Sequence, residues 1–109
     1  MTPFNALDLV QRLAADEGRC VLYTPVLEEL RQRGMDSDDL LGIVQTELGE
    51  THCTASKTTE KYYPGTTSDY YSIWVDDCSE WMFLKLLVAP APGGGERLVI
   101  TSFKKDNTR

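Results

Sequence analysis

The sequence contains little of what three common protein classes require. No apolar stretch approaches the roughly 18 residues of a membrane-spanning helix, and Lys85 interrupts the longest candidate, residues 81–89. The three cysteines, Cys20, Cys53 and Cys78, are odd in number and form no C-x-x-C pair, so a disulfide framework is not expected. The first residues include neither a basic segment nor the apolar run of a secretory signal. We therefore expect a soluble cytoplasmic protein.

Residues suited to metal binding and thiol chemistry are also scarce. The single histidine, His52, lies beside Cys53, but adjacent residues of an extended strand point to opposite faces, so the pair cannot readily share an ion. Asp76, Asp77 and Glu80 could hold a divalent cation. They fall where a turn between strands is expected, however, and acidic residues in a turn need no such explanation. We expect no metal and no cofactor.

The acidic residues are concentrated in one half of the chain. The 109 residues include 17 acidic and 11 basic side chains, for a net charge of −6. Residues 1–50 hold 10 acidic and 4 basic side chains, whereas residues 51–109 hold 7 of each. An acidic protein is a poor partner for nucleic acid, because cations that neutralise phosphates supply much of the affinity. The even balance after residue 50 still permits a locally basic surface there.

The apolar residues of the first half have the spacing of helices. Thr2-Pro3 and Thr24-Pro25 are typical of helix starts, and Asp36 or Ser37 is typical of a helix cap. Glycine follows each apolar stretch, as it does at many helix ends. Helices are therefore predicted over residues 3–17, 24–33 and 37–48, with a short strand at residues 20–23 on the edge of a sheet.

The second half changes to the alternating pattern of strands. Gly93-Gly94-Gly95 resembles part of a phosphate-binding loop, but no helix follows to complete one, so we interpret it as a hairpin loop. The sequence thus predicts one α+β domain over residues 1–109, with N-terminal helices packed on a C-terminal antiparallel sheet. The predicted strands cover residues 70–76, 81–89 and 97–103.

Alternation within these strands assigns side chains to faces. In the strand over residues 81–89, the apolar set beginning at Met82 predicts the core side, and Trp81, Phe83 and Lys85 lie on the other face. The last strand is expected to direct Val99, Thr101 and Phe103 inward and Leu98, Ile100, Ser102 and Lys104 outward. Directly opposed side chains lie about 5 Å apart at their β-carbons. The expected pairs are Phe83 with Ser102, Trp81 with Lys104 and, across a hairpin centred near Cys78, Tyr71 with Lys85.

Lysines beside flat aromatic rings suit single-stranded nucleic acid, because bases stack on the rings while ammonium groups meet phosphates. The structural alternative is that Phe83 and Trp81 pack under a helix while both lysines extend to water. Spacing alone does not decide between them. If the face is open, the expected RNA-binding residues are Lys85 on a phosphate, Phe83 and Trp81 under bases, and their neighbours Tyr71 and Ser102.

Three segments of the second half carry a family resemblance. They are Ser72-Ile73-Trp74-Val75-Asp76, Phe83-Leu84-Lys85-Leu86 and Leu98-Val99-Ile100-Thr101-Ser102-Phe103-Lys104-Lys105. Together they resemble the C-terminal half of the MqsR toxins, which are RelE-like messenger-RNA interferases of bacterial type II toxin–antitoxin systems. The helix, short strand and helix pair of the first half fit the same outline. The resemblance spans most of the chain, with its identities concentrated in these segments.

The resemblance implies a ribonuclease that needs neither a metal nor the ribosome, and a cognate antitoxin protein as its partner. In this reaction the ribose 2′-hydroxyl attacks the adjacent phosphate while side chains move protons and stabilise negative charge. Lys104 matches the family's C-terminal catalytic lysine. Lys57 lies near the first catalytic lysine, although an ungapped match places Ala55 there. Lys61 is another candidate, because the segment before Tyr70 is longer here than in the family.

The sequence departs from the family at two positions. Val75 replaces a glutamine and Phe83 replaces the catalytic tyrosine; valine forms no side-chain hydrogen bond, and phenylalanine has no proton to exchange. Tyr70 or Tyr71 would have to substitute for that tyrosine. The departures and the acidic charge favour an alternative, a non-catalytic module that binds a basic partner through its acidic helices. We expect the RNA endonuclease, with a reworked site, and keep the binding module as the alternative.

Overall fold

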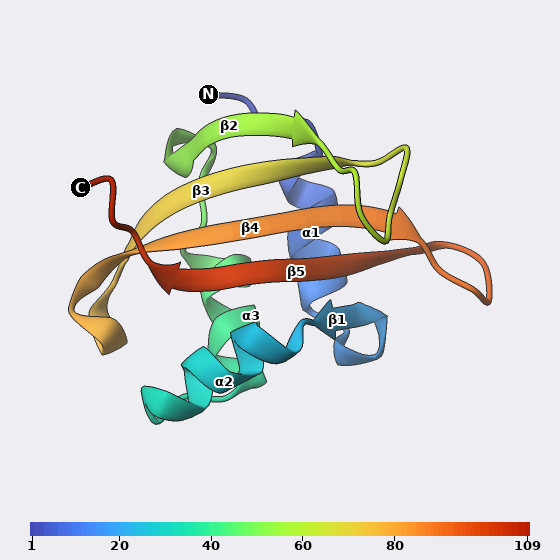
Figure 1. Ribbon diagram of the computed structural model, residues 1–109. Coiled ribbons are helices and arrows are strands. Elements are labelled where there is room, and N and C mark those ends of the chain that lie inside the picture. The colour runs from blue at the N-terminus through green and yellow to red at the C-terminus, as the bar shows by residue number, and fades with distance from the viewer.

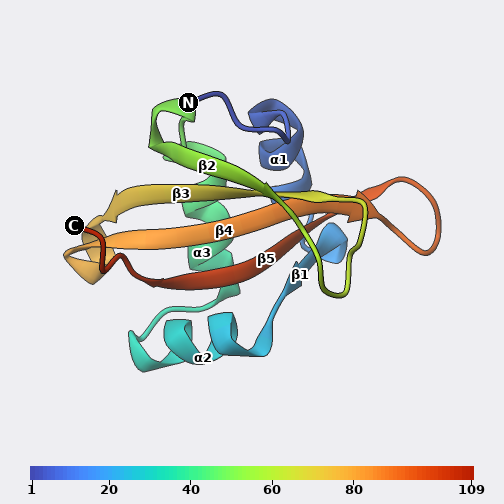
Figure 2. The same ribbon diagram turned by 45° about the horizontal axis from the view of Figure 1, so that its top comes forward.

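A computed structural model describes all 109 residues and has two layers, a five-stranded sheet and three helices on one of its faces (Figures 1 and 2). The general α+β prediction is confirmed. The helices are α1 (Leu7–Ala14), α2 (Thr24–Gln32) and α3 (Ser37–Thr46). The strands are β1 (Cys20–Leu22), β2 (Cys53–Thr58), β3 (Thr67–Val75), β4 (Glu80–Pro90) and β5 (Glu96–Lys105). Short 3-10 turns occupy Glu17–Arg19, Glu50–His52 and Asp76–Cys78.

The sheet is mixed, which corrects the expectation of a purely antiparallel one. Its strand order is β1-β5-β4-β3-β2, with β1 parallel to β5 and every other pair antiparallel. A parallel pair needs a long connection between its strands. Here that connection includes α2, α3 and three strands, so the short N-terminal strand lies beside the last strand of the chain. β2 was not predicted as a strand, because its threonine-rich sequence shows no apolar alternation.

Hydrogen bonds at the helix N-termini decide where α1 and α3 begin. α1 begins at Leu7 rather than near Pro3, because the amides of Phe4 and Asn5 donate to the Asp69 carboxylate at 2.8 and 2.9 Å. α2 agrees with its predicted range to within a residue. α3 begins after Asp36, whose side chain accepts from the Asp39 amide while the Asp39 carboxylate accepts from the Asp36 amide. This reciprocal cap is the capping-box arrangement.

The main core lies between the helices and one face of the sheet. In β4 the predicted core residues Met82, Leu84 and Leu86 are fully buried. The prediction for β5 is partly wrong: Phe103 does face this core, but so do Leu98 and Ile100. The ladder shifts register after the pair formed by Lys85 and Ser102, as at a β-bulge. An extra residue in one strand reverses the alternation on either side of it. The β5 residues before the bulge, which include Leu98 and Ile100, therefore face the side opposite to the one that simple alternation predicts.

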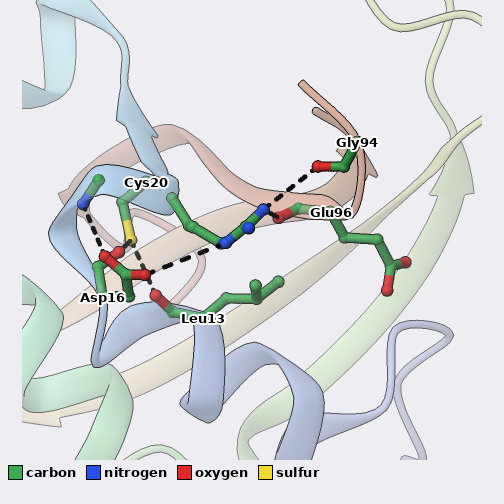
Figure 3. Close-up of polar contacts among 7 residues, drawn as sticks. Leu13, Asp16, Cys20, Gly94 and Glu96 are labelled. Carbon is green, nitrogen blue, oxygen red and sulfur yellow. Dashed lines mark hydrogen bonds and ion pairs between the residues drawn. The ribbon is translucent and has the colours of Figure 1, made fainter. Parts of the chain in front are cut away.

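The hairpin between β4 and β5 is clamped to the turn that precedes β1. The Arg19 guanidinium donates to the carbonyls of Gly94 and Glu96 at 3.4 and 3.3 Å, and Asp16 accepts from the Gly18 amide (Figure 3). A β-carbon at Gly95 would lie 2.9 Å from the Arg19 side chain, and the φ of Gly95 is +72°. The positive φ favours glycine at this position. The glycine run thus forms a hairpin loop, as predicted.

Candidate nucleic-acid interface

The sheet face opposite the helices carries a continuous set of aromatic and basic side chains. Phe83 and Trp81 alternate with the core-facing residues of β4 and point away from all three helices, which cover the other face (Figure 2). The alternative of rings buried under a helix is therefore wrong. We call this surface the open face. Its residues are Lys57, Tyr70, Ser72, Trp74, Trp81, Phe83, Lys85, Ser102, Lys104 and Arg109.

Rings and cations alternate along the open face. The ammonium groups of Lys57 and Lys85 lie 5.5 and 5.3 Å from the centre of the Tyr70 ring. The Tyr70 and Phe83 rings meet edge to face with their centres 5.5 Å apart, and Lys104 lies 5.8 Å from the centre of Phe83. Cations at such distances are attracted to the negative ring faces. They therefore lie where phosphates would meet bases stacked on these rings.

The pairing between β4 and β5 differs from the predicted register by two residues. Phe83 pairs with Lys104, and Lys85 pairs with Ser102. One residue of the difference comes from the position of the hairpin loop and the other from the bulge. The two errors together restore the face, so Phe83, Lys85, Ser102 and Lys104 all lie on the open face as expected. Trp81 lies one residue beyond the last pair of this ladder, Met82 with Lys105, and its backbone carbonyl accepts from the Asp106 amide at 2.9 Å.

Tyr71 is the site prediction that the structure overturns. It pairs with Leu84 and is fully buried in the main core, while Tyr70 pairs with Lys85 on the open face. A one-residue error in the turn between β3 and β4 is enough for this, because side chains alternate with a period of two. Burial raises the pKa of the Tyr71 hydroxyl well above its ordinary value. Tyr70 therefore takes the position that the sequence analysis gave to Tyr71.

A groove of about 490 Å³ lies where residues 59–66 fold back over the open face. Tyr63, from this segment, packs on the small apolar cluster of Leu87, Ala89 and Val99. The groove brings together four of the predicted site residues, and we call it the lysine groove. It is lined by Tyr23, Lys57, Thr58, Thr59, Glu60, Lys61, Tyr62, Ser68, Tyr70, Lys85, Thr101 and Ser102.

Lys104, the expected catalytic lysine, is not part of the lysine groove. It contacts Phe83, and the Tyr70 ring lies between Phe83 and Lys57. Lys57 and Lys61 thus gather with Lys85 around one space, whereas Lys104 stands one ring farther along the sheet. Lys104, predicted as a catalytic residue with Lys57 or Lys61 as the second catalytic cation, therefore lies outside the groove that those two lysines line.

Sequence reasoning missed several residues at the Trp81 end of the open face. Trp74 meets Trp81 with ring centres 6.0 Å apart and is 43% exposed. Ser72 donates to the buried Asp106 carboxylate, and this hydrogen bond is the main reason why the pKa of Asp106 is lowered. Alternation in β3 could have placed Ser72 and Trp74 beside Tyr70. No sequence signal indicates that Asp106 and Arg109 fold back onto this face.

The residues considered for metal or thiol chemistry have structural contacts. His52 accepts from the Gly49 amide at 2.9 Å, and Glu80 forms ion pairs with Arg33 at 3.0 Å and Lys105 at 3.8 Å. Burial raises the pKa of the Cys20 thiol to about 11. No three histidine, cysteine or acidic side chains are grouped so as to hold a metal ion. None of the helices has the length and apolar character needed to cross a membrane.

Comparison with known proteins adds no assignment to this surface. The open face and the lysine groove are therefore interpreted from their own residues, and the resemblance to the MqsR toxins stays a prediction. Neither a scan against models of protein families nor a search of curated proteins finds a match to this chain.

Proposed function

We propose that the protein is an RNA endonuclease with a RelE-like fold, the toxin of a type II toxin–antitoxin pair. It holds single-stranded RNA on the open face and cleaves it without a metal. The observation that supports this function is the alternation of rings and cations on a sheet face that no helix covers. Stacked bases and neutralised phosphates are how sheet surfaces hold single strands.

Binding is divided between the rings and the cations. Each base stacked on a ring contributes about 1–3 kcal/mol, largely independent of sequence. Lys57, Lys61, Lys85 and Lys104 supply four positive charges on or beside the open face. Four phosphate contacts to a single strand predict a slope of about −3 when log affinity is plotted against log salt concentration. The overall acidic charge does not prevent this, because the cations are gathered on one surface.

Cleavage is assigned to the lysine groove. The 2′-oxygen of one nucleotide attacks its 3′-phosphorus, and the bond to the 5′-oxygen of the next nucleotide breaks. The products are a 2′,3′-cyclic phosphate and a 5′-hydroxyl. Glu60 is the groove's carboxylate and accepts the 2′-hydroxyl proton, while a lysine ammonium supplies a proton to the leaving oxygen. The remaining ammonium groups stabilise charge on the crowded phosphate. Tyr70, which also lines the groove, supplies the phenolic hydroxyl that Phe83 lacks.

The test is incubation of long mixed-sequence RNA with purified protein in chelator. Wild-type protein is expected to produce discrete fragments ending in cyclic phosphate. Lys57→Ala is expected to lose cleavage while the protein stays folded, and Lys104→Ala to weaken binding but still cut at saturating protein. Lys105→Ala is the matched control, because Lys105 is exposed at the end of β5 and pairs with Glu80. Intact RNA with folded wild-type protein would reject the proposal.

Comparing the two lysine variants also tests the resemblance directly. The resemblance assigns catalysis to Lys104 together with Lys57 or Lys61, whereas the groove assigns it to Lys57, Lys61 and Lys85 without Lys104. If Lys104→Ala abolishes cleavage at saturating protein while Lys57→Ala leaves it intact, the reaction takes place at Phe83 and not in the lysine groove. The function would then stand with its cleavage site moved.

A second candidate function, the non-catalytic binding module, is favoured by the opposite side of the molecule. Exposed carboxylates gather on and around the helices, including Glu28, Asp38 and Glu47. A basic protein would bind this surface with strong dependence on salt. Two results together would favour this function over the endonuclease. A basic partner would bind in a salt-sensitive way and more weakly to the double variant Glu28→Gln with Asp38→Asn, and RNA would not be retained at low salt.

A further inference from the structure

Residues 106–109, which follow β5, fold back onto the Trp81 end of the open face. We call them the closing segment. The Arg109 guanidinium carbon lies 3.6 Å from the centre of the Trp81 ring. The Arg109 Nε donates to the Ser72 hydroxyl at 3.2 Å. Arg109 thus contacts both the indole ring and the centre of the neighbouring strand.

Asp106 anchors the closing segment from inside the structure. Only 5% of this residue is exposed, and its amide donates to the Trp81 carbonyl at 2.9 Å. Its carboxylate accepts from the Ser72 hydroxyl and, at 3.0 and 2.6 Å, from the amide and hydroxyl of Thr108. Arg109 lies 4.0 Å from the same carboxylate. These bonds hold Arg109 at the end of a short, ordered tether.

The Arg109 contact occupies the position that a base would need. A distance of 3.6 Å between the guanidinium carbon and the ring centre is the spacing of a planar group stacked on the indole face. A nucleobase stacks on the same face at a similar distance, and the two cannot occupy it together. Trp81 is therefore the ring of the open face with the closest cation, because the lysine ammonium groups lie 5.3–5.8 Å from the centres of the Tyr70 and Phe83 rings.

We propose that the closing segment is autoinhibitory: Arg109 competes with RNA for Trp81, and a strand that extends past Phe83 must displace it. The inference rests on the proposed function, because it concerns the same RNA-binding face. When only a fraction of the protein is open, the apparent dissociation constant rises by the inverse of that fraction. A short RNA seated on Tyr70 and Phe83 is not affected, since it does not reach Trp81.

Variants of Arg109 test this competition, because simple electrostatics predicts the opposite result. Loss of a cation from a nucleic-acid face normally weakens binding. We expect Arg109→Ala to bind a long 2′-O-methyl oligouridine, which cannot be cleaved, about three- to tenfold more tightly than wild type, as the loss of one cation–π contact would allow. Arg109→Lys, which keeps the charge but not the planar group, should also bind more tightly. Lys105→Ala serves as the control for charge, and a trinucleotide as the control for length.

The free protein provides an independent measurement. In a Trp74→Phe background, Trp81 is the only tryptophan, and acrylamide quenching of its fluorescence should increase when Arg109 is replaced by alanine. Unchanged quenching, or weaker binding of the long strand by Arg109→Ala, would overturn the inference. Equal binding of the long strand by wild type and both Arg109 variants would overturn it while the proposed function stands. If no variant and no wild-type protein binds RNA, both fail.

Discussion

Replacing Asp69 with alanine is expected to destabilise the protein by about 3–5 kcal/mol. The Asp69 carboxylate is fully buried and accepts four hydrogen bonds. Two come from the amides of Phe4 and Asn5, one from the Asn5 side chain and one from the Ser56 hydroxyl of β2. Asp69 therefore connects both the N-terminal residues and the edge strand β2, which carries Lys57, to β3.

The magnitude follows from what alanine leaves behind. A hydrogen bond to a charged group contributes about 1.5–3 kcal/mol, and an unsatisfied buried donor costs about 1–3 kcal/mol. Four independent losses would exceed the expected total, but the N-terminal residues can move away and let water reach their amides. The expected loss in free energy of unfolding is therefore that of breaking one buried hydrogen-bond network, not the sum of four independent hydrogen bonds. For a chain of this size, it corresponds to a fall in Tm of about 12–20 °C.

The assay is urea unfolding followed by circular dichroism, with thermal unfolding as a second measurement. Asp77→Ala is the matched control, since Asp77 is an exposed carboxylate in the turn before β4 and its loss should change stability by less than about 0.5 kcal/mol. Asp69→Asn, which keeps one acceptor oxygen, should fall between the two. A loss below about 1 kcal/mol for Asp69→Ala would refute the view that this carboxylate holds the N-terminal residues to the sheet.

Three further predictions concern pH, thiol reactivity and RNA binding. Hydrogen bonds, above all from Ser72, lower the pKa of Asp106 from its ordinary 3.8. Its stabilisation is therefore present above that value and is lost as pH falls through the lowered one, so the stability gap between wild type and Asp106→Asn should narrow in acid urea titrations. With a pKa of about 11, Cys20 should react with iodoacetamide at pH 8 about tenfold more slowly in native protein than in urea; equal rates would refute its protection. Tyr70→Ala should weaken binding of 2′-O-methyl RNA by about 5- to 150-fold, as measured by fluorescence anisotropy, whereas Phe4→Ala, which removes an exposed ring elsewhere, should not.

Local patterns predicted most of the secondary structure. The apolar spacing of residues 24–33 predicted the bounds of α2 to within one residue. The apolar alternation of residues 81–89 and 97–103 predicted β4 and β5 with bounds within two residues of those observed. β2 was missed because it is a polar edge strand in which Thr54, Lys57 and Thr58 are exposed, so burial imposes no alternation of apolar residues on it. The start of α1 was misplaced because Asp69, far away in the sequence, accepts hydrogen bonds from the amides of Phe4 and Asn5.

The sequence by itself determined which residues share a face of β4, because neighbouring side chains of a strand without a bulge alternate; in β5 the bulge reverses that alternation. That rule placed Trp81, Phe83 and Lys85 together and away from the core. Only the tertiary structure decided which strands are neighbours and in what register. Register depends on turn position and on bulges. Because the predicted turn was displaced by one residue, Tyr71 was expected on the open face, where the structure has Tyr70.

The two features that complete the candidate site were also decided by tertiary structure. The lysine groove exists because residues 59–66 fold over the sheet to pack Tyr63 on Leu87, and the Trp81 end is covered because Asp106 bonds to Ser72. Both depend on contacts between residues distant in the chain. A local pattern carries no information about such contacts, since they are selected by the burial of apolar surface and the pairing of buried polar groups throughout the fold.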